Sequence, residues 1–254
     1  MSDENRDRPI LAVSPHLDDA VLSVGATLAA LTESGRRVVV CTVFAGDPPR
    51  PLTPAAEAFH RHCGLGADAV AERREEDRRA LAVLGCAAVH LGFPDGIYRR
   101  VDGQPLCYRS GALFEPDLPD DPGLRRSLDA ALIRVLTELD PVSVLTCAAT
   151  GGHIDHRLTV DAVLTACHAT DRSPLLWEDL PYALDEDDSG QVEAVAVAAT
   201  DERHLDRKLR AVSEYRSQLG VLWPDEPSWP ELLRRHALSR PRTLELLRPA
   251  GRFG

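Results

Sequence analysis

Short apolar segments alternate with helix-like segments along this chain, and this alternation constrains the fold more than any other feature. The apolar segments are brief and rich in β-branched residues, as buried strands are. Strands joined by helices favour right-handed crossovers in a parallel sheet. We therefore expect an α/β fold with a Rossmann-like, mostly parallel sheet and helices on both faces. The principal strands are predicted at 9–14, 37–44, 87–91 and 142–147, and the principal helices at 20–34, 71–84 and 122–139.

The remaining segments have weaker patterns. Residues 92–121 are rich in proline and glycine, and a loop of this length inside a compact domain is usually functional or mobile. We expect it, with the C-terminal third, to shape the binding pocket. Further elements are predicted as a short helix within 45–66, a helix from the 153–156 loop to about Ala169, strands at 175–177, 192–198 and 243–247, a helix from a Thr200 cap to Gln218, and a short helix near 230–237.

Composition narrows the class of protein. The chain of 254 residues carries 40 acidic and 29 basic side chains, and this negative balance argues against nucleic acid or an anionic membrane as the main partner. The six cysteines form no C-x-x-C pair, and no apolar run approaches the ~20 residues that span a bilayer. The charged N-terminus lacks the apolar core of a signal peptide, so we expect a cytoplasmic protein.

Two His/Asp clusters follow predicted strands. Pro15–Asp19 comes after the strand at 9–14, and His153–His156 comes after the strand at 142–147. Ligands in α/β folds gather at the carboxyl ends of strands, and buried charges need a partner or a metal. Two imidazoles and one carboxylate, with positions left open, are typical of catalytic zinc. The pattern indicates a metal-dependent hydrolase. The alternative is that Asp18 only caps a helix and that the histidines are ordinary loop residues.

The two clusters also carry a resemblance. Ser14–Ala20 (SPHLDDA) and Gly152–Arg157 (GHIDHR) resemble the LmbE-like, or PIG-L, deacetylase family. Members are zinc-dependent enzymes that remove acetyl groups from N-acetylglucosamine units in glycolipids, thiol cofactors and antibiotic intermediates. The resemblance spans about 8–220, which leaves 221–254 as a C-terminal extension of a single domain over 1–254. It is supported by Arg73-x-x-Glu76, by Leu91–Asp95 and by Lys208–Gln218.

Some positions depart from the family pattern. Leu17 and Ala20 stand where many members have Pro and Glu, a form that resembles the branch of natural-product deacetylases. Gly151 stands where some members have a tyrosine. If that tyrosine contributes to catalysis in those members, another residue must take its place here or the contribution is absent.

The resemblance implies a role for each cluster residue. It assigns the metal, Zn²⁺ or another first-row divalent ion, to His16, Asp19 and His156. Asp18 is then the general base that takes a proton from the metal-bound water and passes it to the leaving amine. Helix capping by Asp18 is the alternative.

Further roles concern the transition state and the substrate. When water attacks the amide, the carbonyl oxygen gains negative charge, and a protonated His153 would stabilise this oxyanion. Asp155 would raise the pKa of His153 and so favour its protonated form. Arg73 and Asp95 are candidates for holding the substrate. The alternatives are that Arg73 is a solvated charge and that Asp95 only forms a turn. The segment Trp177–Tyr182 is a further candidate for lining the pocket or for the core.

The substrate that this implies is a small molecule carrying an N-acetylated amino sugar. An amidase acting on a larger amide or a thiol-cofactor conjugate, and a non-catalytic binding protein on the same scaffold, remain alternatives. A nucleotide-binding transferase is disfavoured because such a fold needs a glycine-rich first turn to bind phosphate. Residues 14–25 are acidic instead, and Gly25 is their only glycine. Four apolar residues of the predicted loop need to be buried somewhere, and a contact with a second copy of the chain would bury them. We therefore consider a homo-oligomer on the basis of Tyr98, Leu106, Tyr108 and Leu113.

Overall fold

The computed structural model describes residues 7–184, 195, 197–224, 228–239, 245 and 247–250, and it confirms the α/β fold. Its central sheet has the strand order β3-β2-β1-β6-β7-β8, in which only β8 runs antiparallel to its neighbour. The strands are β1 (Ile10–Ser14), β2 (Val38–Thr42), β3 (Ala87–His90), β6 (Ser143–Cys147), β7 (Leu175–Trp177) and β8 (Leu247–Pro249), with a separate two-stranded ribbon of β4 (Arg100–Val101) and β5 (Gln104–Pro105).

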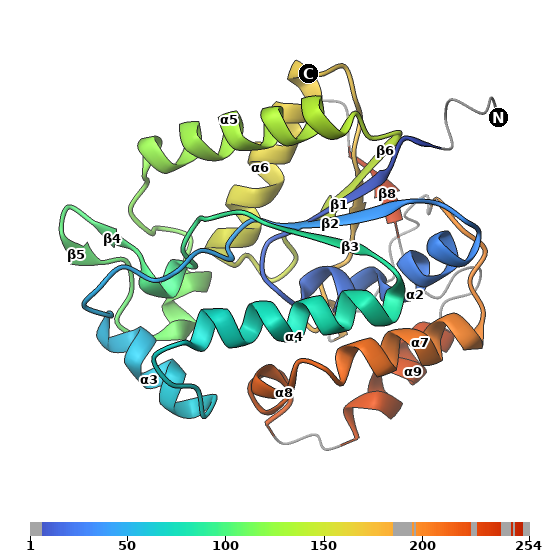
Figure 1. The fold of residues 1–254 in the computed structure, drawn as a ribbon. Coiled ribbons are helices and arrows are strands. Elements are labelled where there is room, and N and C mark those ends of the chain that lie inside the picture. Colours follow the sequence, from blue (N-terminus) through green and yellow to red (C-terminus); the bar gives the residue numbers. More distant parts are fainter. Residues whose placement is uncertain are drawn as a thin grey trace.

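Helices cover both faces of the sheet. Alternate residues of each strand point to opposite faces, so Ile10 and Ala12 pack in one apolar cluster while Leu11 and Val13 pack in the other. Helices α5 and α6 cover one face, and α2, α4, α7 and α9 cover the other (Figure 1). The helices are α2 (Asp19–Glu33), α3 (Pro54–His62), α4 (Ala69–Leu84), α5 (Pro122–Leu139), α6 (Ile154–Ala169), α7 (Glu202–Val212), α8 (Arg216–Leu222) and α9 (Trp229–Ser239).

The strand order places a topological switch point beside β1. The chain passes from β1 to β2 and β3 in one direction, and later returns to β6 on the other side of β1. The connections after β1 and β6 therefore diverge at their carboxyl ends, which is where open α/β sheets form their ligand crevice. Both His/Asp clusters lie at this point.

A buried ion pair supports the helix that follows β1. Helix α2 is kinked at Val24, where φ is −126°. The carboxylate of Glu245 accepts hydrogen bonds from the backbone N–H groups of Ala26 (2.9 Å) and Thr27 (2.7 Å), just beyond the kink. Nζ of Lys208 donates to the same carboxylate at 2.7 Å, and both charged side chains are buried. The C-terminal part of the chain thus holds α2 in place.

Several predicted elements differ from the structure. The helix expected from Thr200 to Gln218 is two helices, α7 and α8, and its cap is Asp201, which accepts from the backbone N–H of Arg203 and His204. In the strand expected at 192–198, residues 192–194 and 196 lie outside the described residues, and the others are not in a strand. The strand expected near 243–247 begins only at Leu247; residues 243, 244 and 246 also lie outside the described part.

The long segment 92–121 is largely folded onto the domain. It contains two 3-10 turns, η1 (Gly96–Tyr98) and η2 (Ser110–Phe114), and the β4–β5 ribbon. Tyr98, Leu106 and Leu113 are buried within the chain itself, whereas Tyr108 is exposed. The argument for an oligomer from the burial of these residues therefore fails for three of the four. In the described part of the chain, no helix has both the length and the apolar character to cross a membrane.

Candidate metal centre

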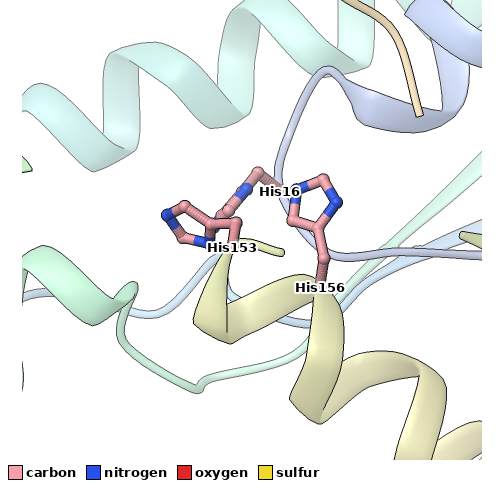
Figure 2. A group of neighbouring side chains, drawn as sticks. All are labelled: His16, His153 and His156. Carbon is pink, nitrogen blue, oxygen red and sulfur yellow. The ribbon is translucent and has the colours of Figure 1, made fainter. Parts of the chain in front are cut away.

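The structure brings the two sequence clusters together at the switch point. His16 lies in the loop after β1, and Asp19 is the first residue of α2. His153 is the N-cap of α6 and His156 lies in its first turn, so the predicted 153–156 loop is mostly helix. Figure 2 shows the three imidazole rings meeting from these two segments. Their ring centroids lie 5.0–5.4 Å apart.

One carboxylate oxygen connects two of the imidazoles. Oδ2 of Asp19 lies 3.3 Å from Nδ1 of His16 and 3.3 Å from Nε2 of His156. It also accepts the backbone N–H of His16 at 2.8 Å, which fixes its position. Ligand atoms held about 2.0–2.2 Å from a tetrahedral ion lie about 3.3–3.6 Å apart. The two separations therefore match the edges of a tetrahedral site.

The buried face of His156 provides a test of whether these residues fit a metal. Its Nε2 atom is buried and makes no hydrogen bond, although it faces Asp19. Buried polar atoms without a hydrogen-bond partner are rare. A nitrogen that makes no hydrogen bond can instead donate its lone pair to a metal ion. The pKa of Asp19 is held well below its usual value by His156 and His16 despite its burial, so it is an anionic ligand. His16, Asp19 and His156 thus suit a divalent cation.

Asp179 orients the second imidazole, a role that the sequence analysis did not assign to any residue of the segment Trp177–Tyr182. Its Oδ1 atom lies 2.7 Å from Nδ1 of His156, so it accepts a ring N–H there, while Nε2 faces Asp19. The charge of Asp19 and the hydrogen bond to Asp179 raise the pKa of His156 to about 9 despite its burial, so a metal at Nε2 would replace a proton. Its Oδ2 atom accepts from the backbone N–H of Ala148 (3.1 Å) and Thr150 (2.9 Å). Carboxylates in this position fix the tautomer and orientation of metal-binding histidines. The available signal was an acidic residue two positions after Trp177, at the end of the next strand.

Asp155 performs the corresponding task for His16 rather than for His153. Its Oδ2 atom lies 3.0 Å from Nε2 of His16 and accepts the backbone N–H of Gly96 at 2.8 Å. Its Oδ1 atom lies 2.6 Å from Nη1 of Arg99 in a buried ion pair. The carboxylate is thus occupied by groups on the loop after β3. Arg99 is a second residue of the site that the sequence analysis missed.

The protonation expected for His153 is not what its surroundings favour. Burial and the neighbouring His16 lower the pKa of His153 to about 4, and the charge of Asp155 does not compensate. Nδ1 of His153 accepts the backbone N–H of Asp155 at 3.2 Å, because His153 caps α6. The ring is therefore neutral near pH 7 and carries its proton on Nε2.

Asp18 and the two predicted substrate contacts lie beside the three ligands. Asp18 makes no side-chain capping bond, so the capping alternative is wrong, and burial with the charge of Asp19 raises its pKa to about 6. Arg73 is buried rather than solvated, and its guanidinium lies 3.8 Å from Asp18 and 3.9 Å from Asp95. Asp95 also accepts from the backbone N–H of Ile97, so it forms a turn and faces the site as well.

Other groups of side chains in the described residues have donor atoms close enough for a metal. His153 is less suited than Asp19 because its Nδ1 is already used in capping α6. Burial raises the pKa of the Cys147 thiol well above its usual value. The Cys147 sulfur also lies 3.5 Å from the carbonyl oxygen of His156, to which its S–H donates. The three groups are His16, His153 and His156; Cys147, His156 and Asp179; and His16, Asp95 and Asp155.

The metal centre lies in the wall of a cavity of about 320 Å³. Segments 95–114 and 218–222 both contribute to its lining, as the sequence analysis expects. From the segment Trp177–Tyr182 only Pro181 and Tyr182 line it, whereas Trp177 is in the core. A Cβ atom on Gly151 would lie 2.8 Å from Cγ of Tyr182, so the ring of Tyr182 occupies the space that a side chain at 151 would need.

Comparisons with known proteins agree with this geometry. Residues 11–167 match the PIG-L family, described as GlcNAc-PI de-N-acetylase. The chain is 31% identical over 242 residues to 2'-N-acetylparomamine deacetylase of Niallia circulans, covering 87% of this chain and 85% of the relative. It is 35% identical over 193 residues to the enzyme of the same name from Streptomyces fradiae, covering 75% of this chain and 61% of that relative.

Solved structures give the same assignment. The zinc-inhibited form of teicoplanin deacetylase superposes with a TM-score of 0.81 at 36% identity, covering 95% of this chain and 97% of the other. The A40926 pseudoaglycone deacetylase superposes with a TM-score of 0.77 at 37% identity, covering 98% and 99%. With the family match over more than half of its length and the two His/Asp clusters in one site, this chain belongs to the PIG-L family.

Proposed function

We propose that this protein is a metal-dependent hydrolase that removes an N-acetyl group from a small molecule containing an amino sugar. The observation that carries the proposal is the position of Oδ2 of Asp19, 3.3 Å from one nitrogen of His16 and of His156, in the wall of a cavity beside Asp18. The relatives named above are deacetylases that act on 2'-N-acetylparomamine, in teicoplanin biosynthesis and on the A40926 pseudoaglycone, which supports the same reaction class here.

The metal would be held by His16, Asp19 and His156. A divalent ion bound there supplies Lewis acidity and lowers the pKa of water. Zinc suits two imidazoles and a carboxylate. Because the structure of teicoplanin deacetylase is that of a zinc-inhibited form, the metal is tested with several ions.

The remaining groups perform proton transfer and orientation. Asp18 is buried beside the ligands and acts as the base that removes a proton from the attacking water and returns it to the leaving amine. His153, neutral with its proton on Nε2, donates a hydrogen bond to the developing oxyanion. Asp155 and Asp179 hold the ligand rings. Arg73 and Asp95 contact the polar part of the substrate, and Arg73 also orients Asp18.

The domain and its partners follow from the same proposal. Residues 1–254 form one deacetylase domain, in which Lys208 and Glu245 join the C-terminal part to α2. The partner is a small N-acetylated sugar derivative. The acidic chain offers no support for nucleic acid or a membrane as a partner.

The test is a mass-spectrometric assay of acetate release. The metal-loaded protein is incubated with a panel of N-acetylated amino sugars and aminoglycosides, with and without a chelator. Acetate should appear only without chelator, and Asp18→Asn should reduce the rate by about 10²–10⁴-fold. Asp117→Asn, which changes an exposed aspartate that does not line the cavity, is the control. Release of a larger acyl group alone would favour the amidase alternative, and binding without turnover would favour a non-catalytic protein.

A further inference from the structure

Helix α4 buries three charged side chains on one face. Arg73, Glu76 and Asp77 are spaced three and four residues apart, so they lie on the same side of the helix, and all three are buried. Arg73 alone among them lines the cavity beside the metal centre. A buried carboxylate needs hydrogen-bond donors, and both Glu76 and Asp77 receive them from the segment 215–217.

These two carboxylates hold the beginning of α8. Oε1 of Glu76 accepts the backbone N–H of Ser217 at 3.0 Å, and Oε2 accepts the Ser217 hydroxyl at 2.6 Å. Oδ1 of Asp77 accepts the hydroxyl of Tyr215, the N-cap of α8, at 2.8 Å. The first backbone N–H groups of a helix have no partner within the helix, so a carboxylate that accepts from them holds the helix in position. The next residue, Gln218, is thereby fixed against α4.

The hydrogen bonds of Ser217 determine the orientation of the Gln218 amide. Ser217 gives its only hydroxyl proton to Glu76, so its oxygen can only accept from Gln218. The amide atom that lies 2.8 Å from this oxygen is therefore Nε2, which also lies 4.0 Å from Sγ of Cys63. Both N–H groups of Gln218 thus have acceptors. Within the part of the chain that the structure describes, its Oε1 atom accepts no hydrogen bond.

Gln218 adds a neutral acceptor to a cavity whose other acceptors are mostly acidic. Its side chain lines the same cavity as Asp18, Asp19 and Asp95, although the residue is only 4% exposed. A neutral amide oxygen suits a neutral donor, and the hydroxyl groups of a sugar are donors of this kind. A further carboxylate at this position would also attract the ammonium group of the deacetylated product and delay its release.

We propose, building on the proposed function, that Gln218 is a substrate-binding residue whose Oε1 atom accepts a hydrogen bond from a hydroxyl group of an N-acetylglucosamine unit. Glu76 is a positioning residue, because it fixes the direction of the Gln218 amide through Ser217. In the resulting chain of hydrogen bonds every donor points toward Glu76: the sugar hydroxyl to Gln218, Gln218 to Ser217, and Ser217 to the carboxylate.

The experiment uses the methyl β-glycoside of N-acetylglucosamine and its 3-deoxy, 4-deoxy and 6-deoxy derivatives. With the unmodified, metal-loaded protein, one of the three deoxy compounds should lose about tenfold in kcat/KM, because Oε1 of Gln218 is then left without a donor. In Gln218→Met, which keeps the length of the side chain without the amide, the parent glycoside should lose a similar factor, mainly through KM. The same deoxy compound should lose nothing further.

A second variant tests the direction of the hydrogen-bond chain. In Glu76→Gln the side-chain amide can donate to Oγ of Ser217, so that the hydroxyl proton turns to Gln218 and the Gln218 amide reverses. This variant should also lose discrimination at the same sugar hydroxyl, and combining it with Gln218→Met should add no further loss. It serves in place of Gln218→Met if that variant does not fold.

The matched control is Gln104→Met, the same change at an exposed residue outside the cavity lining. It should keep the ratio of the parent to the deoxy compound seen in the unmodified protein. A role of Gln218 in folding alone would lower the activity of Gln218→Met on all four glycosides and leave this ratio unchanged, which would overturn the inference. Three deoxy compounds that are all as good as the parent would overturn it as well.

Affinities separate this inference from the proposed function. They are measured by isothermal titration of the parent and the three deoxy glycosides into metal-loaded Asp18→Asn protein. If no glycoside releases acetate, the proposed function fails for this sugar, while the ratios of the affinities still decide whether Gln218 accepts the hydroxyl. If the parent glycoside does not bind, the inference fails, whereas acetate release from another N-acetylated amino sugar would leave the proposed function standing.

Discussion

Asp19 and His156 come from opposite halves of the chain, yet Oδ2 of the aspartate lies 3.3 Å from Nε2 of the histidine. The contact exists because β1 and β6 are adjacent in the sheet while their following connections diverge. The helices that follow them, α2 and α6, deliver the two residues from their first turns. The metal centre is thus a product of the topology of the sheet, and supporting residues can be tested separately from the ligands.

Asp179 supports the metal from outside the ligand set. Asp179→Asn removes the negative charge that holds the N–H of His156 at 2.7 Å, so metal affinity should fall about 10–100-fold with the fold intact. The measurement is a competition titration against a chromophoric chelator. Asp117→Asn, which is exposed, should bind as tightly as the unmodified protein. Equal affinities for both variants would show that Asp179 does not support the site.

Arg99 neutralises a carboxylate that is fully buried. Arg99→Met would leave Asp155 without this cation, and breaking a buried pair by removing one partner costs about 3 kcal/mol or more of unfolding free energy. Denaturant unfolding of the metal-free protein measures this. The matched control is Arg100→Met, because Arg100 is the exposed neighbour and should change stability by about 0.5 kcal/mol or less. A similar small loss for both variants would mean that the pair is not needed.

The pair of Lys208 and Glu245 is suited to a double-mutant cycle. Lys208→Met leaves a buried carboxylate and should cost about 3 kcal/mol. Glu245→Gln removes the charge but keeps an oxygen that can accept from Ala26 or Thr27. The combined variant should therefore lose less than the sum of the two single losses. Strictly additive losses in denaturant unfolding would rule out the coupling.

His60 should make stability depend on pH. It is buried with Nε2 2.8 Å from the hydroxyl of Tyr98, and burial followed by the charge of Arg50 lowers its pKa from 6.5. The folded state then favours the neutral ring, so its contribution is complete above pH 6.5 and is lost as pH falls below that value. Between pH 7.5 and 5.5 the melting temperature of the unmodified protein should fall more than that of His60→Gln. If the melting temperatures of the two proteins fall by the same amount, His60 is not the cause of the pH dependence.

Much of the fold could be predicted because local patterns agree with it. Strand β7 and helix α5 have the predicted bounds, and β1 lies within its predicted range because its apolar residues are continuous. The break between α7 and α8 was missed because the charged residues before Gln218 have helical propensity on both sides of it.

The candidate site could be predicted where residues lie next to strand ends. His16, Asp19 and His156 meet as expected, since adjacent strands fix their ends. Contacts predicted only from the spacing of two residues in the sequence were less accurate. Asp155 is two residues from His153, but it meets His16 and Arg99 because the loop after β3 folds over it. That packing is tertiary and leaves no local pattern.

The central claim is that one divalent cation, held by His16, Asp19 and His156, is needed for deacetylation. The most direct measurement is to remove metal from the protein exhaustively and then to follow acetate release and bound metal together while Zn²⁺, or in parallel Co²⁺ or Fe²⁺, is added back. We predict that activity is absent without metal, returns as the first equivalent binds, and does not return in Asp19→Ala. Full activity in the metal-free protein, or recovery in Asp19→Ala at one equivalent, would contradict the account.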